Sequence, residues 1–499
     1  MTFDDAAILA ELDALRAADA PTHGGRVLSY VYDAGRPDLD ELAAQAARRM
    51  QAVNGLDPTT FTSVAALERD VLAFACEILG AGTDAAGTVT SGGTESCLLA
   101  VKTARDLWRT GGGRGIPRLL APVTAHAAFR KAAELFDLTF DGVPVDPATG
   151  TLDASAITDR LGPDVALVVV SAPSYPFAAM DPIAEVAAAC ADAGVSCHVD
   201  ACIGGWVLPF WPDPVAAWNL RVPGVTSLSA DLHKYGYAPK GVSVLLHATR
   251  DRHRAQYFAT TDWPGYPVVN PTLLGSKSAA ALAAAWAIIR ALGADGFRDL
   301  AAQAARATHA LRDVVGGIEG LRVVGEPAGP LFAVATDQTV PAARRVDPHH
   351  WADRVREAGW MLQQQPGLVQ PGGIRLPHTA HLTVTPVTEA GLGELVPALV
   401  AAADAVRGVP PVDPASLLAG LPGSLPERLD SDTAGALLAG IGLGGVDAAG
   451  VDGGGGGGAL PERMAPFLAL IEALPHPLTE RLLVELLAQL SARSEAGAP

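Results

Sequence analysis

Short apolar runs alternate with longer alanine-rich segments between about residues 58 and 290. The segment 181–194 has helical periodicity, with Asp181 as the expected N-cap and Gly194 as the residue just after the helix. Because strand and helix patterns alternate along the chain, the sequence predicts a mostly parallel sheet with helices on both faces. Four runs have the length and apolar content of buried strands: 166–173, 195–201, 225–231 and 241–248.

The pattern changes on both sides of this region. Residues 278–315 predict a long helix, a break near Gly293 and a second helix. After residue 408 the chain is Pro-rich and contains the glycine run Gly453–Gly458, which predicts a flexible linker before amphipathic helices interrupted at Pro475 and Pro477. Those last helices suit docking onto the same subunit or a partner subunit, or a separate partner motif. We therefore divide the chain into an N-terminal arm (1–57), a large domain (58–295), a small α+β domain (296–408) and a linker with a helical extension (409–499).

Charge and cysteine content narrow the class of protein. The chain has 499 residues and a formal net charge of −18, which disfavours binding to nucleic acid or to anionic lipid. We find neither the basic and apolar segments of a signal peptide nor an uninterrupted apolar run long enough for a membrane span. The five cysteines form no CxxC pair, which favours a reduced protein. We expect a cytoplasmic protein.

Four polar positions lie next to the ends of predicted strands or the beginnings of predicted helices. Asp200 closes one strand, Lys234 follows another, His126 opens a helix, and residues 90–94 (TSGGT) precede a helix. Taken singly, each has an ordinary explanation, because Ser, Thr and Gly cap helices and a lone His is most often a surface residue. In a parallel sheet, however, ligands bind beyond the carboxyl ends of the strands. The four positions are therefore candidates for one ligand site.

Pyridoxal 5'-phosphate is the ligand that accounts for all four positions. Backbone N–H groups at the helix start suit its phosphate, and Asp200 suits its pyridinium nitrogen. His126 suits stacking on its ring, and Lys234 suits Schiff-base formation with its aldehyde. The order of these positions along one α/β domain is that of an aspartate-aminotransferase-like, fold type I enzyme.

Several stretches resemble the group II pyridoxal-phosphate-dependent decarboxylase superfamily, and within it the sphingosine-1-phosphate lyase branch. They include GTVTSGGTESCLLAVKTARD, VVVSAPSYPFAAMDPIAEVA and HVDACIGGWVLPF, within about residues 85–295. The stretch SADLHKYGYAPKG, residues 229–241, is similar to the lyase branch in particular. The resemblance implies a homodimer with shared active sites.

The same resemblance implies roles for individual residues. Lys234 would form a Schiff base with the cofactor. The substrate amine would then displace Lys234, giving an external aldimine. Lys240 and Tyr237 would lie at the substrate, with Lys240 near its own phosphate; Tyr30 and Tyr235 are further candidates for a catalytic hydroxyl. The remaining cofactor-binding residues would be Asp200, His126, Ser91, Gly93, Thr94, Cys202 and His233, together with Ser276 from the neighbouring subunit.

The resemblance and its departures set the expected function. The lyases carry SAPNFPHG and GSRPG where this chain has SAPSYPFAA and GSKSA, so Ser174, Phe177 and Lys277 replace an Asn, a His and an Arg. We expect a lyase that cleaves the Cα–Cβ bond of a phosphorylated or anionic amino alcohol. An amino-acid decarboxylase is the alternative, and a non-catalytic scaffold is a third hypothesis. No metal site is expected.

Overall fold

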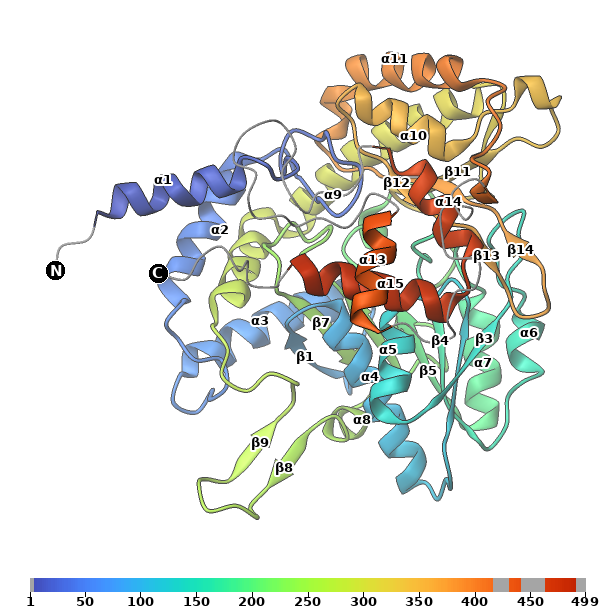
Figure 1. Ribbon diagram of the computed structural model, residues 1–499. Coiled ribbons are helices and arrows are strands. Elements are labelled where there is room, and N and C mark those ends of the chain that lie inside the picture. Colours follow the sequence, from blue (N-terminus) through green and yellow to red (C-terminus); the bar gives the residue numbers. More distant parts are fainter. Residues whose placement is uncertain (1–3, 416–429, 441–462, 491–499) are drawn as a thin grey trace. The chain divides into compact units, whose positions relative to one another are not determined.

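The computed structural model describes residues 4–415, 430–440 and 463–490 (Figure 1). These residues cluster into two compact units. The first comprises the described parts of residues 1–313, 324–333 and 382–396; the second comprises those of 314–323, 334–381 and 397–499. The glycine run Gly453–Gly458, predicted as a linker, lies outside the described residues.

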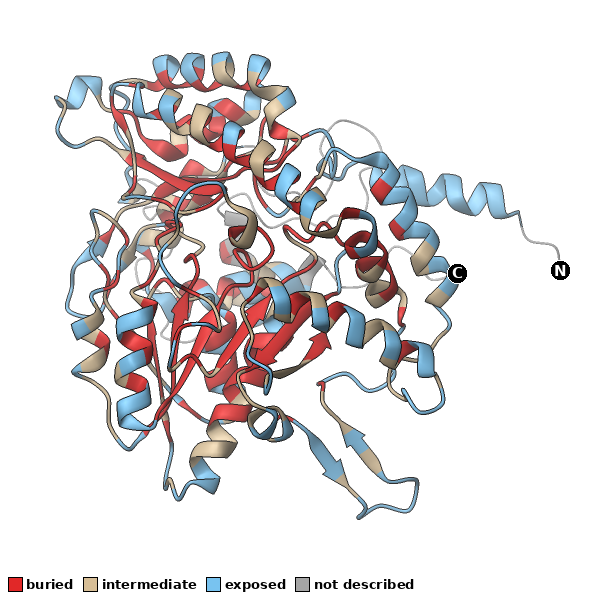
Figure 2. Ribbon diagram, turned by 180° about the vertical axis from the view of Figure 1, so that it is seen from behind, coloured by how far each residue is buried: buried red, intermediate tan, exposed pale blue. Residues whose placement is uncertain are grey.

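A seven-stranded sheet forms the centre of the first unit, in the order β1-β7-β6-β5-β4-β2-β3. Strands β3, β2, β4, β5 and β6 are parallel, whereas β7 is antiparallel to both β6 and β1. Every residue of β4, β5, β6 and β7 is buried, as Figure 2 shows for the centre of the sheet. This burial on both faces explains the continuous apolar runs and confirms the α/β fold class. The strands are β1 (Ala86–Thr90), β2 (Arg118–Pro122), β3 (Thr139–Val143), β4 (Val165–Ser171), β5 (Ser196–Asp200), β6 (Ser227–Ala230) and β7 (Ser243–His247).

Helices surround this sheet. Leu98 and Val101 of α4 and Phe129 of α5 share one buried apolar cluster with Leu119 of β2 and Leu167 of β4. The helices are α1 (Asp5–Arg16), α2 (Pro37–Met50), α3 (Thr62–Ile78), α4 (Gly93–Thr110), α5 (Ala128–Phe136), α6 (Ala154–Thr158), α7 (Ile183–Ala193), α8 (Arg250–Arg254) and α9 (Ala280–Gly316), with a 3-10 turn, η1, at Leu208–Phe210.

Two predicted helix boundaries are confirmed, and one predicted cap is wrong. Gly293 interrupts α9 with φ 53° and ψ −170°, and Gly194 ends α7 in the left-handed conformation at φ 69°. Pro182, not Asp181, is the N-cap of α7, and it caps no N–H group with its side chain. The Asp181 side chain instead accepts a hydrogen bond from Ser171 N at 2.7 Å, at the end of β4. Asp181 therefore ties a loop to the sheet, a long-range contact that a local capping rule does not anticipate.

A hairpin of β8 (Phe258–Thr260) and β9 (Val268–Asn270) extends away from the central sheet (Figure 1). Its apolar side chains Phe258, Tyr266 and Val269 are 59%, 60% and 60% exposed. Helix α1 is likewise exposed, and none of its residues is buried. Both features leave large apolar side chains uncovered by the described chain.

A four-stranded sheet has the order β10-β11-β15-β12, with β10 antiparallel to β11 and β12 antiparallel to β15. The side chain of Asp353 on α10 accepts hydrogen bonds from Met464 N and Ala465 N, at 2.9 and 3.1 Å, and so satisfies the first N–H groups of α14. The predicted break near Pro475 and Pro477 is confirmed, because it separates α14 from α15. The remaining elements are β10 (Leu321–Val323), β11 (Leu331–Thr336), η2 (Ala342–Arg344), α10 (Pro348–Glu357), β12 (Gln363–Gln365), β13 (Leu368–Val369), β14 (Arg375–Leu376), β15 (Thr379–Thr383), α11 (Thr388–Val406), α13 (Ser431–Gly440), α14 (Ala465–Ala473) and α15 (His476–Leu490).

Candidate active site

The sheet topology gathers the predicted site positions at one edge. Asp200 is the last residue of β5, His126 follows β2, and Lys234 follows β6. Strand β1 is antiparallel to β7, which is antiparallel to β6, so β1 and β6 point the same way. The segment 90–94 at the end of β1 therefore emerges at the same edge as the other three. This is the edge at which open α/β sheets bind ligands.

Lys234 is paired with an acid that sequence reasoning did not select. Its Nζ lies 3.0 Å from Oδ2 of Asp231, and the Asp231 side chain is only 2% exposed. Burial lowers the pKa of Lys234, but Asp231, together with Tyr32, Cys202 and Asp200, outweighs burial and raises the pKa well above its ordinary value. His233 Nε2 lies 3.5 Å from the same carboxylate oxygen. The Asp231 carboxylate thus holds the amine in place at the end of β6.

The segment at the start of α4 has the close packing expected of a phosphate cradle. A Cβ atom on Gly93 would lie 2.6 Å from Oδ2 of Asp231, so only glycine fits there. Gly92 has φ 150° and faces His233, whose Cε1 would lie 3.2 Å from an added Cβ. Ser91 and Thr94 flank the two glycines. The bare backbone at a helix N-terminus matches the phosphate group of pyridoxal phosphate.

Glu95 holds residues 91–94 in place, and it was not predicted from the sequence. It is 6% exposed and accepts hydrogen bonds from Ser91 N and Leu273 N, both at 2.6 Å. It thereby ties the start of α4 to the loop that carries Ser276. The Ser276 hydroxyl lies 3.5 Å from Nδ2 of Asn54, and its predicted role across a subunit interface stays a prediction.

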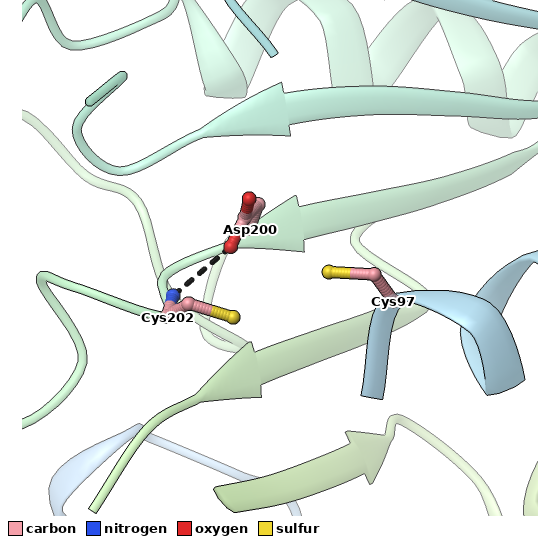
Figure 3. A group of neighbouring side chains, drawn as sticks. All are labelled: Cys97, Asp200 and Cys202. Carbon is pink, nitrogen blue, oxygen red and sulfur yellow. Dashed lines mark hydrogen bonds between the residues drawn. The ribbon is translucent and has the colours of Figure 1, made fainter. Parts of the chain in front are cut away.

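Asp200 presents a carboxylate at the end of β5 (Figure 3). It is 8% exposed, and Oδ1 accepts a hydrogen bond from Cys202 N at 3.0 Å. Among the described residues, no hydrogen-bond partner accompanies its second oxygen, Oδ2. A buried carboxylate with an open oxygen suits a positively charged partner such as a pyridinium N–H.

Cys97 and Cys202 lie beside Asp200, with both sulfur atoms turned toward each other (Figure 3). One ligand atom from each of the three residues lies within 4.8 Å of the others, a spacing that a metal ion could use. The pKa of Cys202 is raised well above normal by its contact with the Cys97 thiol and by burial, so it stays a thiol. The sequence analysis named Cys202 and missed Cys97.

His126 lies in the turn between β2 and α5. Its Nδ1 accepts a hydrogen bond from Ala128 N at 3.2 Å, which fixes the ring at the start of α5. The predicted stacking on the cofactor ring stays a prediction.

Lys240 is held by the backbone of two segments. Its Nζ donates to Tyr30 O at 3.0 Å and to His233 O at 3.2 Å, and it lies 4.7 Å from the centroid of the Tyr32 ring. Burial lowers the pKa of Lys240, and the charge of Lys234 lowers it further. The charge of Lys234 thus reaches Lys240, six residues further along the same turn.

The tyrosines separate into different environments. Tyr235 is fully buried and donates its hydroxyl to Val384 O at 2.8 Å, whereas the Tyr237 ring packs on Phe297 with centroids 6.4 Å apart. The structure thus places the Tyr237 ring in an aromatic cluster, and its predicted contact with substrate stays a prediction. Tyr32 is half-buried, and its pKa is raised by desolvation and lowered in part by Lys234. Sequence reasoning selected Tyr30 and missed Tyr32, although the two lie in the same short segment, SYVYD.

Comparisons with known proteins identify the family of this chain. A family described as "Pyridoxal-dependent decarboxylase conserved domain" matches residues 35–333, and "Pyridoxal-dependent enzyme, C-terminal putative HTH domain" matches residues 413–489. The second match covers most of the predicted linker and helical extension.

Among similar proteins, the sphingosine-1-phosphate lyase of Dictyostelium discoideum is 32% identical over 76% of this chain and 68% of its own. That of Drosophila melanogaster is 34% identical over 70% of this chain and 63% of its own. The solved structure of the Burkholderia pseudomallei sphingosine-1-phosphate lyase has a TM-score of 0.74 and 33% identity, covering 82% of this chain and 92% of that chain. Lactobacillus brevis glutamate decarboxylase, at 18% identity and a TM-score of 0.71, shares the fold.

Proposed function

The chain belongs to the pyridoxal-dependent decarboxylase family, and from this premise we propose a lyase that cleaves the Cα–Cβ bond of an anionic amino alcohol. A phosphorylated amino alcohol is the substrate class that the site supports best. The similar proteins named above are lyases of sphingosine 1-phosphate, which belongs to this class.

The observation that carries this proposal is the position of Lys240. Its ammonium group is anchored by two backbone carbonyls and an aromatic ring, in the same turn as Lys234. A lysine held in this way can attract a substrate phosphate without contacting the reacting carbon. A simple amino-acid decarboxylase has no need for this second cation.

Bound pyridoxal phosphate supplies an electron sink for the pair left when a bond at the amine-bearing carbon breaks. Asp200 would hold the proton on the ring nitrogen, and Lys234 would hold the aldehyde carbon and supply the proton-transfer group. Gly93 and Thr94 would hold the phosphate through their backbone N–H groups, with Ser91 and His233 beside them. Lys240 binds the anionic end of the substrate and so orients the bond to be broken.

A homodimer with shared active sites is part of the proposal. Ile8, Leu9, Leu12 and Leu15 of α1 are 52–71% exposed, and the β8–β9 hairpin also exposes apolar side chains. Exposed apolar surface of this extent is typical of an interface, and a second copy is the partner that a shared site requires. Ser276 would then reach the phosphate in the neighbouring subunit.

We also propose a cytoplasmic protein that does not span a membrane. One described helix, α9, is long and apolar enough by length and composition to cross a membrane. It is interrupted at Gly293, and 44% of its most apolar window is buried within the protein. These two properties support a pair of core helices.

The test is an assay of the purified protein with a phosphorylated sphingoid base, measuring long-chain aldehyde and phosphoethanolamine. Lys240→Ala should raise KM for this substrate about 10- to 100-fold, with a much smaller change in kcat, because a charge-assisted contact is lost. Lys131→Ala, at an exposed lysine of α5, is the matched control and should change neither value. Release of carbon dioxide from amino acids, with no aldehyde formed, would instead establish the decarboxylase alternative.

A further inference from the structure

A buried histidine lies behind Asp200, and none of the roles assigned above uses it. His198 is on β5, two residues before Asp200, and its side chain is 0% exposed. In the parallel pairing of β5 with β6, His198 is opposite Ser227 and Asp200 is opposite Ser229. Because side chains alternate along a strand, His198 and Asp200 lie on the same face of β5.

Hydroxyl groups contact both nitrogens of this ring. Nδ1 lies 2.9 Å from the Ser227 hydroxyl, and Nε2 lies 3.1 Å from the Ser229 hydroxyl. Ser229 accepts a hydrogen bond from the Cys202 thiol at 3.2 Å and donates a longer one, 3.5 Å, to Oδ1 of Asp200. Ser229 therefore connects the histidine to the carboxylate.

The number of protons available on His198, Ser229 and Asp200 determines which group donates each hydrogen bond. Burial lowers the pKa of His198 to about 4, so near neutral pH the ring is uncharged and carries one N–H. The carboxylate of Asp200 can only accept, and it is a stronger acceptor than an imidazole nitrogen. The Ser229 proton then goes to Asp200, the Nε2–H of His198 goes to Ser229, and Nδ1 accepts from Ser227.

We propose that His198 is a positioning residue that turns the Ser229 hydroxyl toward Asp200 and so orients Asp200 for the cofactor ring nitrogen. This inference rests on the proposed function for its ligand and on the β5–β6 contacts for its geometry. His198 acts through Ser229 and does not itself touch the cofactor.

Matched variants test the direction of the hydrogen bonds from His198 through Ser229 to Asp200. Ser229→Ala should weaken pyridoxal phosphate binding about three- to tenfold, the size of one lost hydrogen bond, and shift the pH midpoint of the bound cofactor's absorbance. Ser227→Ala removes a hydroxyl from the other side of the same ring, and it should change cofactor binding less than about twofold. His198→Asn, which loses the Nε2 donor, should resemble Ser229→Ala, and His198→Gln, which retains a donor at that end, should restore binding.

Thermal unfolding of the same variants separates this role from a structural one. If the His198 and Ser229 variants unfold at lower temperature while cofactor binding and the absorbance midpoint stay as in the wild type, the proposal is wrong.

Nitrogen NMR of the histidine rings tests the geometry without cofactor. We expect a neutral His198 with Nε2–H between about pH 5 and 8, identified by the signal lost in His198→Gln. An Nδ1–H or charged ring would contradict the proposal. A wild-type protein that binds no pyridoxal phosphate would contradict the proposed function instead, and the NMR result would still decide the direction of the hydrogen bonds.

Discussion

His198 and His378 are both enclosed histidines with polar partners on two sides, but the partners differ in charge. His198 in the first unit lies between two serine hydroxyls. His378 in the second unit has Oδ2 of Asp347 at 2.7 Å from Nε2 and Oε1 of Glu472 at 3.8 Å from Nδ1. Burial keeps the first ring neutral, whereas carboxylates favour a proton on the second.

The charges around His378 come from several elements. Asp347 caps α10 by accepting from His349 N and His350 N, Arg375 on β14 pairs with Glu472 of α14, and the His349 ring lies 4.6 Å from the His378 ring. Burial lowers the pKa of His378, but the hydrogen bond to Asp347 and the charges of Asp347 and Glu472 together outweigh it, and the net shift is upward. The pKa of Asp347 is lowered to about 2, because burial is outweighed by its contact with His378. These groups line a cavity of about 350 Å³ within the second unit.

The different surroundings of His198 and His378 imply different responses to pH. A neutral histidine held by hydroxyls keeps the same hydrogen bonds at pH values above its pKa of about 4. A charged histidine held by carboxylates links α14 to the rest of the second unit only while it keeps its proton. The arrangement around His198 suits a site whose geometry stays fixed with pH. The arrangement around His378 suits a contact that depends on pH.

The largest expected effect separates the two regions by activity. Asp200→Asn should reduce kcat/KM by at least about a hundredfold, because the ring nitrogen loses its charged partner. Asp347→Asn removes the same charge from the second unit and should leave kcat/KM within about threefold. Steady-state assays of both variants check this, and equal losses would remove the distinction between the regions.

An intermediate effect is expected on stability. His378→Ala should lower the free energy of unfolding by about 1–3 kcal/mol, because the buried Asp347 and the partly buried Glu472 lose a half-buried partner. Chemical denaturation followed by circular dichroism measures it. Glu357→Gln on α10, whose partners Arg354 and Arg463 are largely exposed, is the control and should have little effect. A His378 variant as stable as the wild type would contradict the expected role of the cluster.

The smallest expected effect is on the pH dependence of the free energy of unfolding. The folded-state pKa of His198 is about 4, below the ordinary value, so the unfolded chain binds more protons and stability falls on acidification from about pH 6.5 to 4. His378 has a raised pKa, so its contribution is present below about pH 6.5 and is lost as pH rises through its folded-state pKa. Unfolding free energies across pH should show a shallower acid slope in His198→Gln and a shallower alkaline slope in His378→Gln. Unchanged slopes in both variants would contradict the two protonation states.

Local sequence patterns predicted the sheet and its ends because period and strand length depend on near neighbours. The break at Gly293 and the left-handed Gly194 follow from the conformational freedom of glycine. Glu95 was missed because its partner Leu273 is 178 residues away, and no local rule connects them. Asp181 was assigned to a cap because the capping rule considers only the residues that follow, whereas its actual partner, Ser171, ends the preceding strand β4. Asp231 had a usable signal, an acid at a strand end three residues before the lysine.

The most direct test of the central claim is an absorbance spectrum of the purified protein beside that of Lys234→Ala, followed by the aldehyde assay on both. We predict a band from lysine-bound pyridoxal phosphate that disappears in the variant, together with loss of aldehyde formation. A wild-type protein without this band, even after pyridoxal phosphate is added, would contradict it.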